Sequence, residues 1–134
     1  MNLDGQTRIR LARPSLDLAA AERFYVDGLG LSVLHRHDAE MGDEFSLLML
    51  GLPGVAWHLE LTHSASHSVQ PAPTADDLLV LYLGQPVAVD TLAHLQACGG
   101  VRVPALNPYW DEWGVTLRDP DGYRSVLCQR EWTA

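Results

Sequence analysis

Apolar residues recur along the chain with two periods, one typical of β-strands and one typical of α-helices. Residues 8–13 alternate basic and apolar side chains, which predicts a strand. One face of this strand, carrying Ile9 and Leu11, is expected to pack on an apolar layer, while the arginine face turns toward something polar. Pro14 ends the pattern.

A helix and three strands are predicted next. Apolar residues repeat at helical spacing over residues 18–27, after Asp17 as N-cap and before Gly28, which suits the left-handed position that follows a helix. Three strands follow at residues 31–36, 45–50 and 55–63. The first half of the chain therefore predicts the order β-α-β-β-β.

The second half repeats this order. Residues 78–83 predict an apolar strand, and residues 87–98 show helical spacing before the stop signal Gly99-Gly100. Three further strands are predicted at residues 101–103, 114–118 and 123–129. The last two flank Asp119-Pro120-Asp121-Gly122, which suits a type I turn closed by a glycine bulge. The less regular stretch between Val103 and Trp113 is counted as strand on the strength of the repeat.

We interpret the chain as one α+β domain, residues 1–134, made of two βαβββ modules. The first module covers about residues 6–63 and the second about residues 77–132. A connector rich in Ser, Ala, Pro and Thr joins them over residues 64–76. The alternative is a ferredoxin-like βαββαβ domain, which has too few strands to use residues 45–63.

Composition narrows the possible functions. The 134 residues include 47% hydrophobic and 19% charged residues, which fits one compact globular domain. All nine basic residues are arginines, so Schiff-base chemistry and a P-loop lysine are excluded. A net charge of −8 has the wrong sign for a nucleic-acid-binding face. We expect no nucleic-acid partner.

The cellular setting is expected to be the cytoplasm. The polar start of the chain has no signal-like apolar stretch, and the longest apolar runs are too short to cross a membrane. The only two cysteines, Cys98 and Cys128, lack the spacing of a metal or redox motif. We expect both to be reduced and buried.

Several strings of residues carry a family resemblance. They are Asp17-Leu18, Phe24-Tyr25, Gly28-Leu29-Gly30-Leu31, His58-Leu59-Glu60-Leu61-Thr62 and Asp119-Pro120-Asp121-Gly122-Tyr123. In this order they resemble the vicinal oxygen chelate superfamily, which includes glyoxalase I, extradiol dioxygenases, and fosfomycin and bleomycin resistance proteins. Asn107-Pro108-Tyr109-Trp110 is similar to a bleomycin-resistance-like subgroup.

The resemblance implies two modules whose sheets curl around a cleft, often completed in a homodimer. In metal-using members, four ligands lie on the first and last strands of each module. The resemblance puts these positions at Arg10, Glu60, Leu78 and Val126 in this chain. Only Glu60 has a side chain that binds a divalent cation, and an arginine repels one. We therefore expect no metal and no other cofactor.

Arg10, His58 and Glu60 are the candidate polar site. Arg10 and Glu60 either form a partly buried ion pair that replaces the metal, or Arg10 binds an anionic ligand that Glu60 orients. His58 shares a strand face with Glu60, so either residue is a candidate catalytic base. An unexpected metal site would combine His58 and Glu60 with a third histidine from the set His35, His37, His63 and His67.

The candidate ligand-binding set is completed by residues of the second half. Tyr82 shares a strand face with Leu78 and Val80, and polar-tipped aromatic residues suit the mouth of a cavity for a flat organic molecule. Arg124 would add a second cation. The complete set is Arg10, His58, Glu60, Tyr82, Tyr109, Trp110, Trp113 and Arg124. Core packing, a dimer contact or simple exposure are the alternatives for the aromatic residues and for Arg124.

The sequence favours a cytoplasmic, dimeric, metal-free protein that binds a small, largely apolar or aromatic molecule, as bleomycin-resistance-type binders do. The alternative is a glyoxalase-like lyase or isomerase, or a related enzyme, that uses Glu60 or His58 as base, with or without a divalent metal. No activated nucleophile stands out, so we do not expect covalent catalysis. The sequence leaves undecided whether the protein catalyses any reaction.

Overall fold

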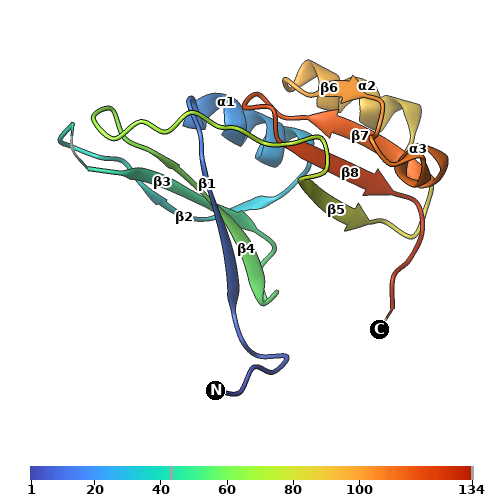
Figure 1. Cartoon of the computed structure of the whole chain (residues 1–134), viewed down its shortest axis with the longest axis horizontal. Coiled ribbons are helices and arrows are strands. Elements are labelled where there is room, and N and C mark those ends of the chain that lie inside the picture. The colour runs from blue at the N-terminus through green and yellow to red at the C-terminus, as the bar shows by residue number, and fades with distance from the viewer. Residues whose placement is uncertain (43, 134) are drawn as a thin grey trace. The chain divides into compact units, whose positions relative to one another are not determined.

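The computed structural model describes residues 1–42 and 44–133, in two compact units, Met1–Pro71 and Ala72–Ala134. The division falls within the predicted connector 64–76. Each unit contains one four-stranded sheet and its own helices (Figure 1).

The first unit has the predicted order of elements. These are β1 (Ile9–Pro14), α1 (Leu18–Glu22), η1 (Arg23–Gly28), β2 (Ser32–His37), β3 (Ser46–Gly51) and β4 (Trp57–His63). The strands lie in the order β1-β4-β3-β2. β1 runs parallel to β4, and the other two pairs are antiparallel.

The core of this unit lies between one face of the sheet and the helical segment. Alternate residues of β3 and β4 are almost fully buried, namely Leu48, Leu50, Leu59 and Leu61. The helical segment contributes Ala21, Phe24 and Tyr25, each 0% exposed. The alternate leucines of the strands form one side of the apolar core, and the helically spaced residues form the other side.

The predicted helix over residues 18–27 begins where expected but ends differently. Asp17 is the N-cap, and its Oδ1 accepts a hydrogen bond from Ala20 N at 3.0 Å. After Glu22 the chain continues as a π-helix, η1, and Gly28 still belongs to it. The left-handed glycine is Gly30, with φ of 83°, so the prediction for Gly28 was wrong. With the wider π turn the helical segment ends at Gly28, and the left-handed glycine moves from position 28 to position 30.

The apolar face of β1 is also not buried as predicted. Ile9 and Leu11 are 62% and 49% exposed, whereas Arg13, farther along the same face, is 9% exposed. β1 is an edge strand, and the helical segment packs against β3 and β4. Strand alternation correctly predicts which residues share a face, but the helical segment does not cover this edge.

The second unit repeats the topology. Its elements are β5 (Leu78–Tyr82), α2 (Val89–Ala97), β6 (Val101–Val103), α3 (Pro108–Trp113), β7 (Gly114–Arg118) and β8 (Arg124–Cys128). The strands lie in the order β5-β8-β7-β6, again with the first and last strands parallel. The predicted hairpin is confirmed, with Gly122 at φ of 93° between β7 and β8.

One predicted strand is instead a helix. The stretch between Val103 and Trp113 forms α3 after a short loop. Asn107 caps this helix by accepting a hydrogen bond from Tyr109 N at 3.1 Å, and Pro108 occupies its first turn. Proline fixes a helical φ and needs no N–H partner there, so Asn-Pro starts a helix at this point.

The α+β class and the two βαβββ modules are confirmed. Eight strands exclude the ferredoxin-like alternative over the described residues. Across residues 1–42 and 44–133, none of the helices has the length and apolar character needed to cross a membrane.

Candidate functional site

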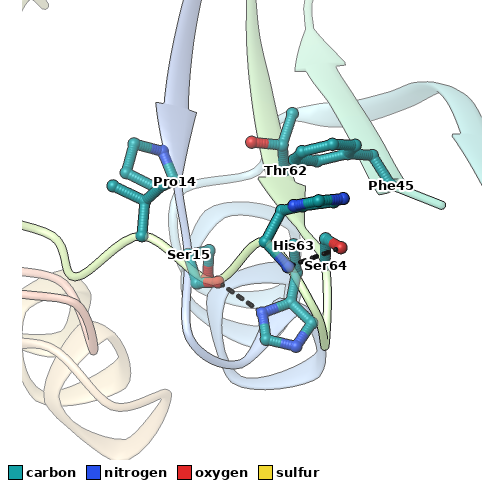
Figure 2. Close-up of a pocket in the computed structure, with 8 residues that line it drawn as sticks. Pro14, Ser15, Phe45, Thr62, His63 and Ser64 are labelled. Atoms are coloured by element: carbon teal, nitrogen blue, oxygen red, sulfur yellow. Dashed lines mark hydrogen bonds between the residues drawn. The ribbon is translucent and has the colours of Figure 1, made fainter. Parts of the chain in front are cut away.

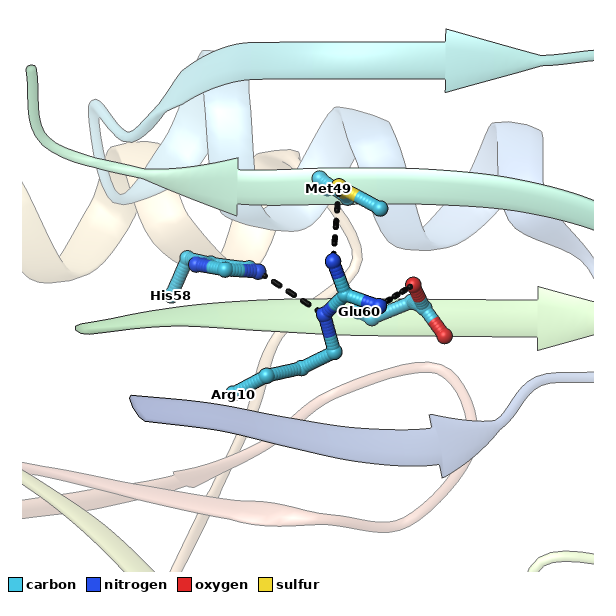
Figure 3. A network of polar contacts seen from close by, with 4 residues as sticks. All are labelled: Arg10, Met49, His58 and Glu60. Atoms are coloured by element: carbon cyan, nitrogen blue, oxygen red, sulfur yellow. Dashed lines mark hydrogen bonds and ion pairs between the residues drawn. The ribbon is translucent and has the colours of Figure 1, made fainter. Parts of the chain in front are cut away.

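A polar cluster on one face of the first sheet joins three strands. In the strand register, Arg10 of β1 lies beside His58 of β4, and Glu60 of β4 lies beside Met49 of β3. The four side chains meet above this face (Figure 3). We call Arg10, Met49, His58 and Glu60 the arginine cluster.

The guanidinium of Arg10 is the centre of the arginine cluster. Its Nε donates to His58 Nε2 at 3.0 Å, and its Nη1 lies 3.1 Å from Glu60 Oε2. Its Nη2 points to Met49 Sδ at 3.8 Å (Figure 3). Because His58 Nε2 accepts a hydrogen bond, the proton of the neutral ring is on Nδ1.

The sequence predicted that Arg10 and Glu60 lie together, and the ion pair between them is found. The Arg10 side chain is 49% exposed and that of Glu60 is 12% exposed, so the pair is partly buried. Met49 is a member of the cluster that the sequence did not point to. Its position follows only from the register of β3 against β4.

The residues at the metal-ligand positions of the superfamily do not fit a metal. A fixed positive charge lies against the only carboxylate among them, Glu60. Leu78 and Val126 have no donor atoms, and Val126 is 0% exposed. No group of three or more His, Cys, Asp or Glu residues in the described part of the chain could hold a metal ion.

The predicted aromatic residues form a second cluster, in the second unit. Tyr82 meets the ring of Trp110 edge to face, with centroids 6.4 Å apart. Tyr109 meets the same ring at 5.0 Å. The guanidinium of Arg130 lies 4.5 Å from the ring centroid of Trp113, and Nη1 of Arg130 donates to Tyr109 Oη at 3.3 Å.

We call these residues, Tyr82, Tyr109, Trp110, Trp113 and Arg130, the aromatic cluster. Tyr82 and Tyr109 are 43% and 38% exposed, so aromatic surface is accessible to a ligand. Arg130 was missed because it follows the last predicted strand and contacts a helix that periodicity did not predict. Its stacking on Trp113 is a cation–π contact that holds the chain after β8 against α3.

Arg124 lies at the start of β8 and is partly exposed. Its Nη1 donates to the backbone oxygen of Pro104, in the loop after β6, at 3.1 Å. The side chain therefore reaches across β7, which lies between β8 and β6.

The remaining histidines are not grouped into a metal site. His63 Nδ1 contacts Ser15 O at 3.0 Å, beside a cavity of about 10 Å³ that holds no more than one water molecule (Figure 2). The ring of His67 stacks on Phe45, with centroids 5.9 Å apart. His37 lies 3.9 Å from a Glu44 carboxylate oxygen. His35 is exposed on β2.

Both cysteines are free and buried, as predicted. Cys128 lies within β8 and is 0% exposed. Cys98 follows α2, and its Sγ lies 3.8 Å from His94 Nε2 one helical turn earlier. The end of a helix disfavours a thiolate, so this geometry does not activate Cys98.

Sequence comparisons place the two modules in one family. Residues 9–62 match the model of the YycE-like N-terminal domain, and residues 76–129 match that of the YycE-like C-terminal domain. The chain is also 38% identical over 121 residues to an uncharacterised YycE protein of Bacillus subtilis strain 168. That match covers 90% of this chain and 86% of the relative.

Solved structures agree. A YycE protein of unknown function from Bacillus subtilis superposes with a TM-score of 0.81 at 36% identity, over 96% of this chain and 93% of that chain. A glyoxalase/bleomycin resistance protein from Streptomyces sp. CB03234 superposes with a TM-score of 0.53 at 25% identity. It covers 92% of this chain and 100% of its own.

Proposed function

Because this chain belongs to the YycE-like family, within the glyoxalase/bleomycin resistance/dioxygenase superfamily, we propose that it binds a small, largely apolar or aromatic organic molecule without a resident metal ion. The observation that carries this proposal is the guanidinium of Arg10, which contacts both His58 and Glu60. These are the two side chains of the cluster with the nitrogen and oxygen donor atoms that zinc binds. The positive charge of Arg10 already neutralises the carboxylate of Glu60.

The aromatic cluster supports the second part of the proposal. Flat organic ligands are held by aromatic side chains together with a few fixed polar groups. Tyr82, Tyr109 and Trp110 provide such faces, and the Arg130 guanidinium is fixed beside them. Half-exposed rings in mutual contact present apolar area without needing to reorganise when a ligand arrives.

An enzyme is the second candidate. Glu60 uses Oε2 in its ion pair, and its Oε1 has no hydrogen-bond partner among residues 1–42 and 44–133. A carboxylate that is held in place and keeps one free oxygen can accept a proton from a bound substrate. This geometry favours Glu60 over His58 as the base of a lyase or isomerase, because His58 Nε2 is already engaged by Arg10.

We also propose that the protein is a cytoplasmic homodimer. Free, buried Cys98 and Cys128 suit a reducing compartment. The exposed Ile9 and Leu11 lie on β1, an edge strand whose outer side is unpaired within its sheet. Apolar side chains on an open edge are a surface that a second subunit would cover.

The test of ligand binding uses biphenyl-4-carboxamide, a neutral and flat aromatic probe. Tryptophan fluorescence should change on titration and saturate at about one probe per chain, in protein stripped of metal by a chelator. Binding that requires added divalent metal would contradict the proposal. Exchange of the α-proton of a carbonyl compound for solvent deuterium would instead support an enzyme. This exchange should be absent in Glu60→Gln.

A further inference from the structure

Two arginines lie directly opposite each other on the sheet of the second unit. Arg118 of β7 and Arg124 of β8 are register partners in the antiparallel pair. Side chains at such positions have Cβ atoms about 5 Å apart, and like charges there destabilise the sheet. This chain, with a net charge of −8, therefore places two fixed positive charges side by side.

Neither arginine has a carboxylate partner among residues 1–42 and 44–133. In the part of the chain that the structure describes, none of the ion pairs involves Arg118 or Arg124. The bond from Arg124 to Pro104 O fixes a guanidinium without neutralising it. The acidic residue next to Arg118, Asp119, is 4% exposed, and its Oδ1 accepts two backbone N–H groups of the turn at 2.9 Å each.

An orphan hydroxyl lies beside this pair. Thr116 precedes Arg118 by two residues, so both share one face of β7. Thr116 is 1% exposed, and its register partners are Val103 and Val126. Among the described residues, its buried Oγ1 has no hydrogen-bond partner. A buried hydroxyl without a partner is costly, and a bound acceptor would remove that cost.

A pocket lies at β6 and the loop that follows it. It has a volume of about 450 Å³ and is lined by Arg102, Val103, Pro104 and Asp111. Pro104 is the residue whose carbonyl oxygen holds Arg124. Arg102 also lines this pocket, but its register partner is Leu117, so strand alternation places it on the other face of the sheet from Arg118. A volume of this size accepts a small organic molecule.

We propose that Arg118 and Arg124 bind an oxyanion, a carboxylate or a phosphate, that belongs to the ligand of this protein. Two guanidinium groups match the geometry of such an anion, and its charge would cancel the repulsion between them. The Thr116 hydroxyl donates to the same anion. The ligand class is therefore an aromatic acid rather than a neutral aromatic molecule.

The aromatic part of this inference rests on the proposed function, whereas the anion site does not. Tyr82 shares its face of β5 with Leu78, and Leu78 is the register partner of Arg124. Four residues along a strand span about 13 Å. A ligand about as long as a biphenyl can thus place its ring near the aromatic cluster and its anionic group between the arginines.

Inorganic phosphate tests the anion site alone. Calorimetric titration at constant ionic strength should give saturable binding to the wild type, and Arg118→Gln and Arg124→Gln should each weaken it by about tenfold or more. Arg8→Gln, which removes an exposed arginine of the first unit, should bind as the wild type does. Without phosphate, Arg118→Gln should melt at the same or a higher temperature, because the repulsion is gone. No binding to the wild type, or equal binding by all four proteins, would overturn the site.

Biphenyl-4-carboxylate and its neutral carboxamide test the ligand class. The carboxylate should bind the wild type about tenfold more tightly than the carboxamide, and this preference should disappear in Arg124→Gln. If the carboxylate and the carboxamide bind with equal affinity while phosphate still binds, the proposal that the ligand is an aromatic acid is wrong. Phosphate binding without carboxamide binding would contradict the proposed aromatic ligand and leave the anion site standing.

Discussion

Arg10 Nη1 lies 3.1 Å from Glu60 Oε2, across two parallel strands whose residues are 50 positions apart in the chain. Glu60 is the more buried of the two partners, so Arg10 compensates the charge of a carboxylate that water reaches poorly. The same guanidinium satisfies His58 Nε2. The arginine cluster is thus a network and not a single surface ion pair.

Removing Arg10 should destabilise the protein more than removing Arg8. We expect Arg10→Ala to lower the free energy of unfolding by about 1–2 kcal/mol, because it leaves Glu60 without a counter-ion. Arg8→Ala should change it by less than about 0.5 kcal/mol. Urea unfolding of Arg10→Ala, Glu60→Gln and the double variant should give a coupling energy of about 1 kcal/mol. Additive effects would show that the two side chains do not interact.

Replacing Arg10 by a residue that can ligate a metal should create a metal site. Arg10→His places an imidazole on β1 beside His58 and near Glu60, which together make a three-ligand set typical of zinc. We expect about one Zn²⁺ per chain in this variant by elemental analysis, and substoichiometric metal in the wild type. Arg10→Gln is the control that removes the charge without adding a ligand. Stoichiometric metal in the wild type, resistant to mild chelation, would contradict a metal-free cluster.

Trp110 is expected to provide most of the aromatic contact with a ligand. Its ring is shared by Tyr82 and Tyr109, so Trp110→Ala should remove the centre of the aromatic cluster. Binding of biphenyl-4-carboxamide should weaken by about 1 kcal/mol, roughly fivefold. Trp132→Ala, at a residue that is 66% exposed, should not change the affinity. A similar loss in both variants would point to a nonspecific effect.

The edge of the first sheet should be part of a subunit interface. We expect sedimentation velocity to show a dimer at micromolar concentration, and Leu11→Glu to shift it toward monomer, since a charge cannot be buried there without a partner. Leu106→Glu, at a residue in the loop before α3 that is 63% exposed, is the matched control. A monomeric wild type would contradict this interface.

The cap of α3 should have a measurable effect on stability. Asn107→Ala removes the acceptor for Tyr109 N, and we expect a loss of about 1 kcal/mol in the free energy of unfolding. Asn107→Ser keeps a capping oxygen and should retain most of the stability. Equal losses in the two variants would mean that the cap itself does not stabilise the helix.

Periodicity in the sequence was enough to predict most of the elements, and the resemblance to the superfamily was what predicted that Arg10 and Glu60 lie together. Alternation decides which residues share a strand face, and that is why His58 and Glu60 lie on the same side. It does not decide whether a face is covered. Ile9 and Leu11 alternate correctly and are nevertheless exposed, because the helical segment packs against β3 and β4, away from this edge strand.

The parts of the candidate sites that were not predicted depend on short or nonlocal features. α3 is too short to show a helical period, although Asn107-Pro108 is a start signal that could have identified it. The place of Arg130 depends on α3, and that of Met49 depends on the strand register. Periodicity alone contains neither kind of information.

The parallel pairing of the first strand with the last in each unit has a consequence for folding kinetics. Arg10 pairs with His58 and Leu78 with Arg124, so each sheet must bring together segments almost 50 residues apart before its edge strand is held. Closing such a loop lowers the conformational entropy of the chain before the strand contacts form and stabilise it. Each module should therefore fold in the slower range for its size, with β1 and β5 docking last onto a meander of three antiparallel strands.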